Sequence, residues 1–455
     1  MNVLRRGALG LAVAAALALP APAAARYDES TIRRPPAQAV VVLVRDGDTG
    51  RVVRNARVRL ARQQPVRANA NGGAAFHVRW VGRLRVRATA PGYAPRTERL
   101  RFGQRRFQVM RLYRPRTQWT MYGAGPRRTQ AQTEIKLRPP FRVVWSRSLG
   151  FLEFPAVVSE GVAYVSNLSG RVRALSMRNG KVLWGRQTPA GKMAASPAVD
   201  GNRVIAHGMD GHVWVLDRET GRVRWKFRIG SPIESSPVVI DGVDYFGSWN
   251  GNVYALDLER RKLRWVVRSG YKITSSVSFA GGRLFVGDYG GRVWALSRQG
   301  RVLWRSSVGG RVYGTPAVAA GRVFVPSSTG RSLTAFSVRG RRLWTVHTGA
   351  YVYSSPAVWA GRVYFGSHNG VLYAVSARNG RVLWRVSGGR PISGAPTVVG
   401  GVVYFGNTGR RLHGVDARSG RTRFTFRDGN YVPVSGNGGK LLLHGVSRLY
   451  AVVPR

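Results

Sequence analysis

Residues 355–384 read SPAVWAGRVYFGSHNGVLYAVSARNGRVLW, and this stretch decides the fold of most of the chain. It contains four short apolar runs, at 357–358, 363–365, 371–375 and 382–384. Gly361, Asn369-Gly370 and Asn379-Gly380 stand between them. Asn-Gly between apolar runs is the strongest local signal for a β-hairpin. The stretch therefore predicts a meander of four antiparallel strands.

The same unit recurs along the last two-thirds of the chain, with an aromatic residue near the end of each copy. These residues are 39 to 41 positions apart: Trp145, Trp184, Trp225, Trp265, Trp304, Trp344, Trp384 and Phe424. A fixed period of this length indicates a repeat architecture. A radial array of four-stranded sheets is a β-propeller. We expect each of these aromatic side chains to fill the wedge between neighbouring blades, with its indole N–H on adjacent backbone.

The two ends of the repeat array differ in phase. The array begins with a strand of the tryptophan type, at 142–145, and ends with a strand of the third type, at 449–453. The last copy therefore lacks a fourth strand, which the first strand of the array can supply, so that no sheet edge stays open. The prediction is an all-β chain whose main part, 142–455, is an eight-bladed β-propeller closed by its first strand.

Recurring sequence patterns within 142–454 carry a family resemblance. They are G-x-V-x-A-L-D, T-G-x-x-x-W, S-S-P-V-V and D-G-x-x-Y-F-G-S. Together they resemble the pyrroloquinoline-quinone (PQQ)-type, or quinoprotein-like, propeller repeat, and WTMYG at 119–123 resembles the segment that precedes such propellers. The resemblance implies one of two functions. Some members are quinone-dependent dehydrogenases with a calcium ion and often a vicinal disulfide, and others are noncatalytic scaffolds such as the outer-membrane assembly propeller.

The first third of the chain has a different organisation. Residues 1–25 read as a signal peptide, with Arg5 and Arg6 before an apolar run and an Ala-Ala-Ala cleavage site. Residues 26–37 are expected to be a tether, and 114–141 a connection without regular structure because prolines and glycines interrupt it. Between them, 38–113 shows short alternating strands that predict a small β-sandwich. Its order of motifs resembles carboxypeptidase regulatory-like modules, which act as adhesion or spacer domains.

Composition narrows the partners and the location. The formal net charge is +53, from 73 basic and 20 acidic residues, and there is no cysteine. The excess of arginine has two readings: an anionic partner such as a cell-wall polymer, or arginine codons of a GC-rich genome at exposed positions. Because the arginines are spread over every repeat, we expect no specific nucleic-acid site. The signal peptide predicts an extracytoplasmic protein, secreted, periplasmic or associated with the cell wall. We also expect a monomer with no transmembrane segment after signal removal.

Catalytic chemistry finds little support in the sequence. Calcium needs six to eight oxygen ligands, yet the loops near the predicted axis carry few acids, chiefly Glu153 and Glu234. These two are two repeats apart, so we do not expect direct contact and read them first as isolated rim charges countered by arginine. A pair of carboxylates acts as acid and base only if both reach one pocket. No catalytic, cofactor or metal residues are assigned, and PQQ with calcium stays an alternative.

A candidate binding rim remains. The residues that we place on it are Glu153, Glu234, Lys272, Arg311, Tyr313, Tyr351 and Tyr353. Aromatic and basic groups of this kind suit a peptide, a glycan or an anionic ligand, and ordinary packing of a crowded funnel is the other reading. The sequence as a whole favours a secreted, noncatalytic binding or scaffold protein of the cell envelope, with PQQ-dependent dehydrogenase and anionic-polymer binder as alternatives.

Overall fold

The computed structural model describes residues 39–78, 82–103, 107–189, 191–429 and 431–455. The predicted signal peptide 1–25 and tether 26–37 lie outside the described residues. The described chain is all-β apart from two short 3-10 helices, η2 (Pro115–Thr117) and η3 (Tyr122–Ala124). No helix among the described residues is long and apolar enough to cross a membrane.

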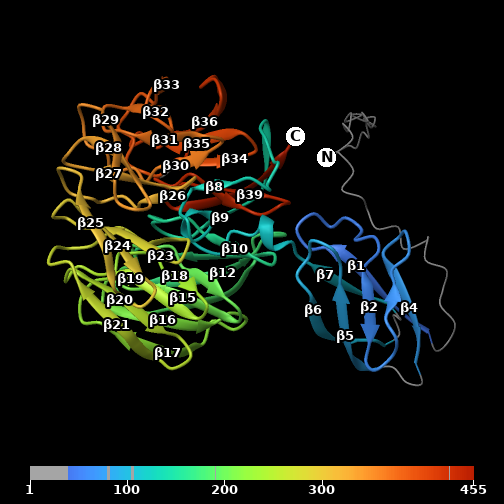
Figure 1. Ribbon diagram of the computed structural model, residues 1–455. Coiled ribbons are helices and arrows are strands. Elements are labelled where there is room, and N and C mark those ends of the chain that lie inside the picture. Colours follow the sequence, from blue (N-terminus) through green and yellow to red (C-terminus); the bar gives the residue numbers. More distant parts are fainter. Residues whose placement is uncertain (1–38, 79–81, 104–106, 190, 430) are drawn as a thin grey trace, which may run out of the picture.

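The N-terminal unit contains two sheets that share one core (Figure 1). One sheet is formed by β1 (Ala39–Asp46), β4 (Gly73–His77) and β7 (Phe107–Leu112), and the other by β2 (Arg57–Leu60), β3 (Val66–Arg67), β5 (Arg83–Thr89) and β6 (Arg96–Arg101). In β5 buried and exposed residues alternate, because successive side chains of a strand point to opposite faces. The buried residues of both sheets face each other and form the core.

The rest of the chain folds into antiparallel four-stranded sheets, which form a β-propeller. We number the eight sheets of the described residues in chain order. Sheet 1 contains β10 (Val157–Ser159), β11 (Val162–Ser166), β12 (Arg171–Ser176) and β13 (Val182–Gln187), and sheet 2 contains β14 (Ala198–Asp200), β15 (Arg203–His207), β16 (His212–Asp217) and β17 (Val223–Arg228). Sheet 3 contains β18 (Val238–Ile240), β19 (Val243–Gly247), β20 (Asn252–Asp257) and β21 (Lys262–Arg268), and sheet 4 contains β22 (Ser278–Ala280), β23 (Arg283–Gly287), β24 (Arg292–Ser297) and β25 (Val302–Ser307).

Sheets 5 to 8 repeat this order, with two additions from earlier in the chain. Sheet 5 contains β26 (Ala317–Ala319), β27 (Arg322–Ser327), β28 (Ser332–Ser337) and β29 (Arg342–His347), and sheet 6 contains β30 (Ala357–Trp359), β31 (Arg362–Gly366), β32 (Val371–Ser376) and β33 (Val382–Ser387). Sheet 7 contains β34 (Thr397–Val399), β35 (Val402–Gly406), β36 (Leu412–Asp416) and β37 (Thr422–Phe426), with β8 (Ala131–Gln132) added. Sheet 8 contains β38 (Val434–Gly436), β39 (Leu441–His444) and β40 (Arg448–Pro454), with β9 (Phe141–Ser148) added. The strands of sheet 6 coincide with the four apolar runs of 355–384. The turn into β32 passes through Gly370 at φ 81, a conformation that favours glycine.

Strand β9 joins the beginning of the array to its end. It pairs antiparallel with β40, and Trp145 lies opposite Ala451. This is the pairing that the phase of the repeats predicts. Figure 1 shows the C-terminal strands in red next to the first strands of the array in teal. First strands of neighbouring sheets also contact one another, as β10 does with β14 and with β38. The first strands therefore surround the central axis.

The stretch 118–132, which we call the central segment, lies along the first strands of the sheets. Its backbone carbonyls accept hydrogen bonds from one first strand after another: Val199 N to Thr120 O, 2.8 Å; Phe279 N to Pro126 O, 2.7 Å; Val318 N to Arg127 O, 2.9 Å; Val358 N to Thr129 O, 2.8 Å; and Val398 N to Gln130 O, 2.8 Å. A bridge between Trp119 and Val158 adds sheet 1. The expectation of irregular structure fits much of this stretch. The sequence did not predict that this backbone accepts hydrogen bonds from the first strands, which form the inner edges of the sheets.

Asp48 connects the N-terminal unit to the propeller. Its Oδ2 accepts hydrogen bonds from Thr117 Oγ1 at 3.0 Å and Gln118 Nε2 at 2.9 Å, and its Oδ1 accepts one from Asn437 Nδ2 at 2.9 Å. Burial, the largest effect, raises the pKa of Asp48 to about 6. The two units thus share a contact whose charge changes between pH 4 and 7.

Candidate functional site

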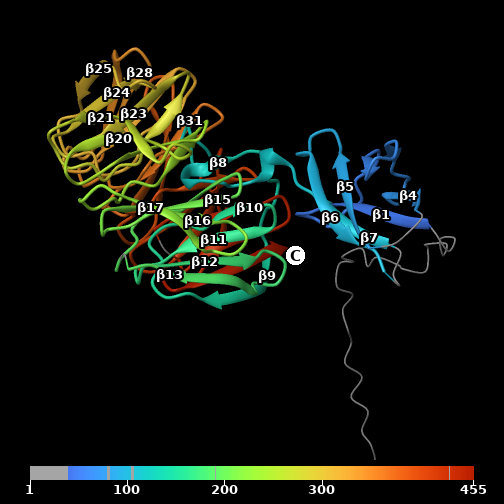
Figure 2. The same cartoon turned by 90° about the horizontal axis from the view of Figure 1, so that it is seen from below.

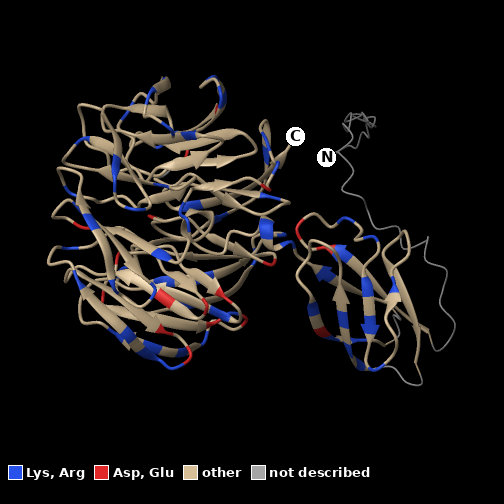
Figure 3. Ribbon diagram, viewed as in Figure 1, with Lys and Arg blue, Asp and Glu red and all other residues tan. Residues whose placement is uncertain are grey.

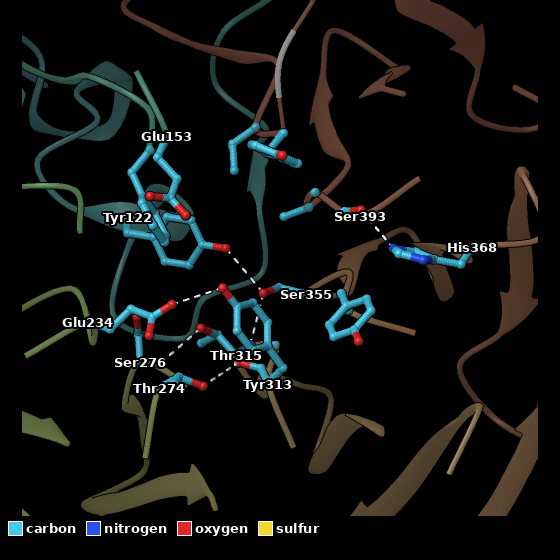
Figure 4. A pocket seen from close by; sticks show the side chains of 17 residues that line it. Tyr122, Glu153, Glu234, Thr274, Ser276, Tyr313, Thr315, Ser355, His368 and Ser393 are labelled. Carbon is cyan, nitrogen blue, oxygen red and sulfur yellow. Dashed lines mark hydrogen bonds between the residues drawn. The ribbon is translucent and has the colours of Figure 1, made fainter. Parts of the chain in front are cut away.

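A cavity of about 410 Å³ lies where the connections between the sheets meet near the axis (Figure 4). Each connection runs from the last strand of one sheet to the first strand of the next, so equivalent residues of different repeats converge there. The cavity is lined by Tyr122, Glu153, Phe154, Glu234, Thr274, Ser276, Tyr313, Gly314, Thr315, Tyr353, Ser355, His368, Ser393, Gly394, Ala395, Tyr431 and Val432.

The strand registers show that one repeat position supplies much of this lining. The position lies four residues before the first-strand residue whose partner on the second strand is seven residues further along the chain. Glu234 stands in this way before Val238, which pairs with Tyr245. The equivalent residues in sheets 1 to 8 are Glu153, Ala194, Glu234, Thr274, Tyr313, Tyr353, Ser393 and Tyr431. All of them except Ala194 line the cavity. We call this set the ring position.

Glu234 is the most constrained acid of the ring position. It is 8% exposed. Its Oε1 accepts a hydrogen bond from the Tyr313 hydroxyl at 2.8 Å, and its Oε2 accepts one from Trp249 Nε1 at 3.0 Å. The Lys272 ammonium stands 3.2 Å from the centre of the Trp249 ring. Burial, followed by the charge of Glu234, raises the pKa of Tyr313, so this hydroxyl stays a hydrogen-bond donor. Both oxygens of Glu234 are thus occupied by neutral donors.

Glu153 is less well satisfied. Its nearest cation is Lys192, whose Nζ lies 3.8 Å from Oε2, and no donor of the described residues hydrogen-bonds that buried oxygen. Burial raises the pKa of Glu153, Lys192 opposes this, and the charge of Glu234 adds to the rise. The two glutamates therefore influence each other electrostatically from two sheets apart. The expectation of isolated rim charges countered by arginine is wrong, because all eight connections converge on one axis and the nearby cations are lysines.

Aromatic rings form the walls between the acids. Tyr313 and Tyr353 meet edge to face with centroids 5.4 Å apart, and His368 lies 4.8 Å from the Tyr353 ring. The His368 Nε2 is 2.8 Å from Ser393 Oγ. Burial lowers the pKa of His368, which favours its neutral form. The backbone of Tyr431 comes so close that a Cβ on Gly394 would lie 1.4 Å from the Tyr431 carbonyl oxygen.

At the inner end of the cavity, hydroxyl groups link one sheet to the next. Each bond runs from a backbone N–H to the hydroxyl of the equivalent residue one repeat further on: Ser196 N to Ser236 Oγ, 3.1 Å; Ser236 N to Ser276 Oγ, 2.9 Å; Ser276 N to Thr315 Oγ1, 3.1 Å; and Thr315 N to Ser355 Oγ, 2.9 Å. The Tyr122 hydroxyl donates to Ser355 Oγ at 3.1 Å. The central segment thus closes the inner end of the cavity.

Arg128 anchors the central segment beneath these hydroxyls. It is fully buried, and its guanidinium donates to four backbone carbonyls. These belong to Val277 at 3.0 Å, Ser236 at 3.1 Å, Pro237 at 2.8 Å and Tyr122. Burial lowers the pKa of Arg128 to about 10. Because this is still well above neutral pH, the arginine keeps its charge there.

Three residues of the predicted rim do not line the cavity: Lys272, Arg311 and Tyr351. Arg311 stands with its guanidinium 5.7 Å from the centre of the Tyr289 ring, and Tyr351 is 42% exposed outside the cavity against Tyr353. Sequence reasoning missed Tyr122, Phe154, His368 and Tyr431. Tyr431 lies three residues before the first strand of its sheet, whereas the other members of the ring position lie four residues before theirs, so the strand register is needed to identify it.

The repeat tryptophans lie at the outer strands. Several donate from the indole to a backbone carbonyl of the next sheet: Trp145 to Met177, 3.1 Å; Trp184 to Arg218, 2.9 Å; Trp265 to Arg298, 2.8 Å; Trp304 to Val338, 3.0 Å; and Trp344 to Ala377, 3.3 Å. The indole N–H of Trp384 has no hydrogen-bond partner among the described residues. These residues are far from the cavity chemistry and belong to the contacts between sheets.

The curated relatives point to two kinds of protein. The chain is 31% identical over 109 residues to "Outer membrane protein assembly factor BamB" of Yersinia pestis, covering 21% of this chain and 28% of that one. It is 35% identical over 80 residues to "Quinoprotein ethanol dehydrogenase" of Pseudomonas aeruginosa, covering 17% and 13%. The matched parts thus span less than a third of these relatives. Both matches confirm the resemblance to PQQ-type propellers.

Solved structures show the same fold at low identity. BamB from Moraxella catarrhalis superposes with a TM-score of 0.59 at 17% identity, covering 69% of this chain and 98% of that one. Quinohemoprotein alcohol dehydrogenase from Comamonas testosteroni superposes with a TM-score of 0.63 at 15% identity, covering 74% and 80%. The family model described as "Beta-alanine-activating enzyme, beta-propeller" matches residues 154–399, more than half of the chain. The chain therefore belongs to this β-propeller family.

Proposed function

We propose that this chain is a noncatalytic binding protein of the cell envelope, and that it holds a protein partner on the cavity face of an eight-bladed ring closed by β9. The N-terminal signal peptide directs it out of the cytoplasm, and the unit at 38–113 serves as a carboxypeptidase regulatory-like spacer. The relatives named as outer membrane protein assembly factors support a role in contacts between proteins.

The observation that carries the proposal is the placement of the exposed aromatic side chains. Among the described residues, five aromatic side chains are 37% to 57% exposed: Phe151, Trp249, Tyr271, Tyr351 and Tyr431. All five lie in connections before a first strand or in a turn between second and third strands. These two kinds of loop lie at one end of the sheets, as hydrogen bonds such as Leu168 N to Phe151 O and Trp249 N to Pro232 O require. Exposed aromatic groups gathered on one face are typical of protein interfaces.

The donor set of the cavity favours binding over quinone chemistry. PQQ is an anionic carboxylate, and its calcium ion takes six to eight oxygens. No group of three or more His, Cys, Asp or Glu side chains among the described residues is placed to hold a metal ion. Glu234 already accepts two hydrogen bonds, and the two glutamates would repel an anionic cofactor. These residues do not fit the quinone and calcium, which supports a ring that works without them.

Binding of an anionic polymer through a local site has weaker support. Figure 3 shows lysine and arginine in both the N-terminal unit and the propeller. A distributed charge of this kind attracts polyanions without a specific site and is screened by salt.

The proposal is tested by placing a photoreactive amino acid at position 271 or 351 in cells that express the chain. Position 302, a 43% exposed valine on the outer strand β25, is the matched control. We expect one discrete protein adduct from 271 and 351, and none from 302. Equal labelling at all three positions would refute a binding face. Stoichiometric binding of PQQ and calcium by the purified chain, with dye-linked alcohol oxidation, would replace the proposal by an enzyme.

A further inference from the structure

The central cavity has a charge opposite to that of the chain. The chain has 73 lysines and arginines against 20 aspartates and glutamates. Among the described residues that line the cavity there are two glutamates and no lysine or arginine. Lys192 and Lys272 approach the two acids from outside the lining. The lining thus carries acids but no basic side chain, although the chain as a whole is strongly positive.

Neighbouring cations neutralise the two acids only in part. Glu234 is held by a phenol and an indole, which are neutral donors, so its negative charge is not cancelled by its hydrogen bonds. Glu153 has a buried oxygen, Oε2, that accepts no hydrogen bond from the described part of the chain. A partly buried carboxylate whose cation, Lys192, stays 3.8 Å away is incompletely stabilised, and the charge of the second acid adds to this. A cation in the cavity would relieve both effects.

The walls suit a flat cation. Tyr313 and Tyr353 present aromatic rings, and Phe154 faces Tyr122 with ring centroids 6.0 Å apart. Aromatic faces attract cations. A guanidinium group stacks on such faces and also pairs with carboxylates in the plane of its N–H groups, which a compact ammonium cannot do as well. The volume of about 410 Å³ accommodates an arginine side chain.

We infer that the cavity receives an arginine side chain of the partner protein. The guanidinium would lie between Glu153 and Glu234, with Glu153 Oε2 as its hydrogen-bond acceptor and the tyrosine rings as its walls. This assignment rests on the proposed function, because it specifies what the binding face recognises. The exposed aromatic residues around the cavity would contact the rest of the partner.

The test is calorimetric titration of the purified full chain with Nα-acetyl-arginine amide and with Nα-acetyl-citrulline amide. Citrulline has the shape of arginine but no charge. A single side chain is expected to bind at about millimolar concentration, and the citrulline compound at least about tenfold more weakly. Glu153→Gln should weaken arginine binding about tenfold. Among the described residues this substitution weakens the 3.8 Å contact with Lys192, and it should leave the fold intact.

Glu259→Gln is the matched control, because it removes one negative charge from a side chain that is 78% exposed and pairs with Arg203. We expect it to bind arginine like the unmodified chain. Equal affinity for arginine and citrulline, equal effects of Glu153→Gln and Glu259→Gln, or no heat of binding at saturating probe would each overturn the arginine assignment. Photocrosslinking from positions 271 and 351 does not depend on the cavity charge. An adduct without arginine binding would therefore refute only the assignment, whereas arginine binding without an adduct would refute only the partner face.

Discussion

Replacing Arg128 by methionine tests whether the central segment holds the sheets together. Methionine has a similar length but no donors, so the substitution leaves four backbone carbonyls without their charged donor. A hydrogen bond to a charged group contributes about 1.5–3 kcal/mol, so the low estimate for four bonds is about 6 kcal/mol. The pKa of Arg128 falls from 12.5 to about 10 on burial. At about 1.4 kcal/mol per pKa unit, keeping this charge in the interior costs about 3 kcal/mol, which methionine does not incur. The expected net loss in the free energy of unfolding is therefore about 3 kcal/mol.

The neighbouring residue provides the control. Arg127 is exposed, and it takes part in the ring through its backbone carbonyl, which Val318 N reaches at 2.9 Å whatever the side chain is. Arg127→Met removes the same positive charge and should change the free energy of unfolding by less than about 0.5 kcal/mol. Denaturant unfolding followed by tryptophan fluorescence compares the two variants. If Arg128→Met is as stable as Arg127→Met, the guanidinium does not anchor the segment and the reasoning fails.

Three further predictions address the cavity, the contacts between sheets and the contact between the two units. Gly394→Ala should lower the free energy of unfolding by about 1–3 kcal/mol, because its Cβ would lie 1.4 Å from the Tyr431 carbonyl oxygen. Calorimetric unfolding compares it with Gly103→Ala, whose Cβ meets no atom of the described residues within 4 Å, and equal melting temperatures would contradict the prediction. Trp265→Phe should lower the free energy of unfolding, measured with denaturant, by about 1–2 kcal/mol, because it removes the 2.8 Å hydrogen bond from the indole to the next sheet and leaves a smaller ring. Unchanged stability would show that this hydrogen bond does not stabilise the contact between the sheets. The pKa of Asp48 is raised to about 6 in the docked state, so contact between the two units should be strongest below about pH 4 and weaken as pH rises through 6. Small-angle scattering between pH 4 and 7 should show the unmodified chain becoming more extended as pH rises, and Asp48→Asn staying unchanged. A flat pH profile for both chains would refute the prediction.

The strands could be predicted from sequence because their determinants are local. The stretch 355–384 contains four apolar runs with glycine at the turns between them, and the same pattern returns with an aromatic residue every 39 to 41 positions. The strands of each sheet follow this pattern closely. The central segment could not be predicted in this way. Its prolines and glycines correctly indicate irregular backbone, but the partners of that backbone are first strands much further along the chain. The most distant hydrogen bond joins Val398 N to Gln130 O, 268 residues apart.

The candidate site lies between these two cases. Tyr313 and Tyr353 were recognised as rim residues because they stand directly before a recognisable first strand. Glu153 and Glu234 were also found, but their distance in the chain hid their proximity in space. In a closed ring, residues at the same repeat position converge on the axis irrespective of the number of repeats between them. Register, which requires the paired strands, was needed to show that Tyr431 belongs to the same position.

The ring position also explains how a propeller of this family can change its ligand without changing its fold. The residues that hold the sheets are repeated: the tryptophans bond the next sheet, and serine or threonine hydroxyls link neighbouring first strands. The residues of the ring position do not form this repeated set of contacts between sheets, and within this one chain they are Glu, Ala, Thr, Tyr and Ser. An anionic quinone would need cations or a metal at this position, whereas this chain places two acids and three tyrosines there. The shared fold therefore predicts where a ligand binds, and the charge at the ring position, which here favours a cation, predicts which ligand it is.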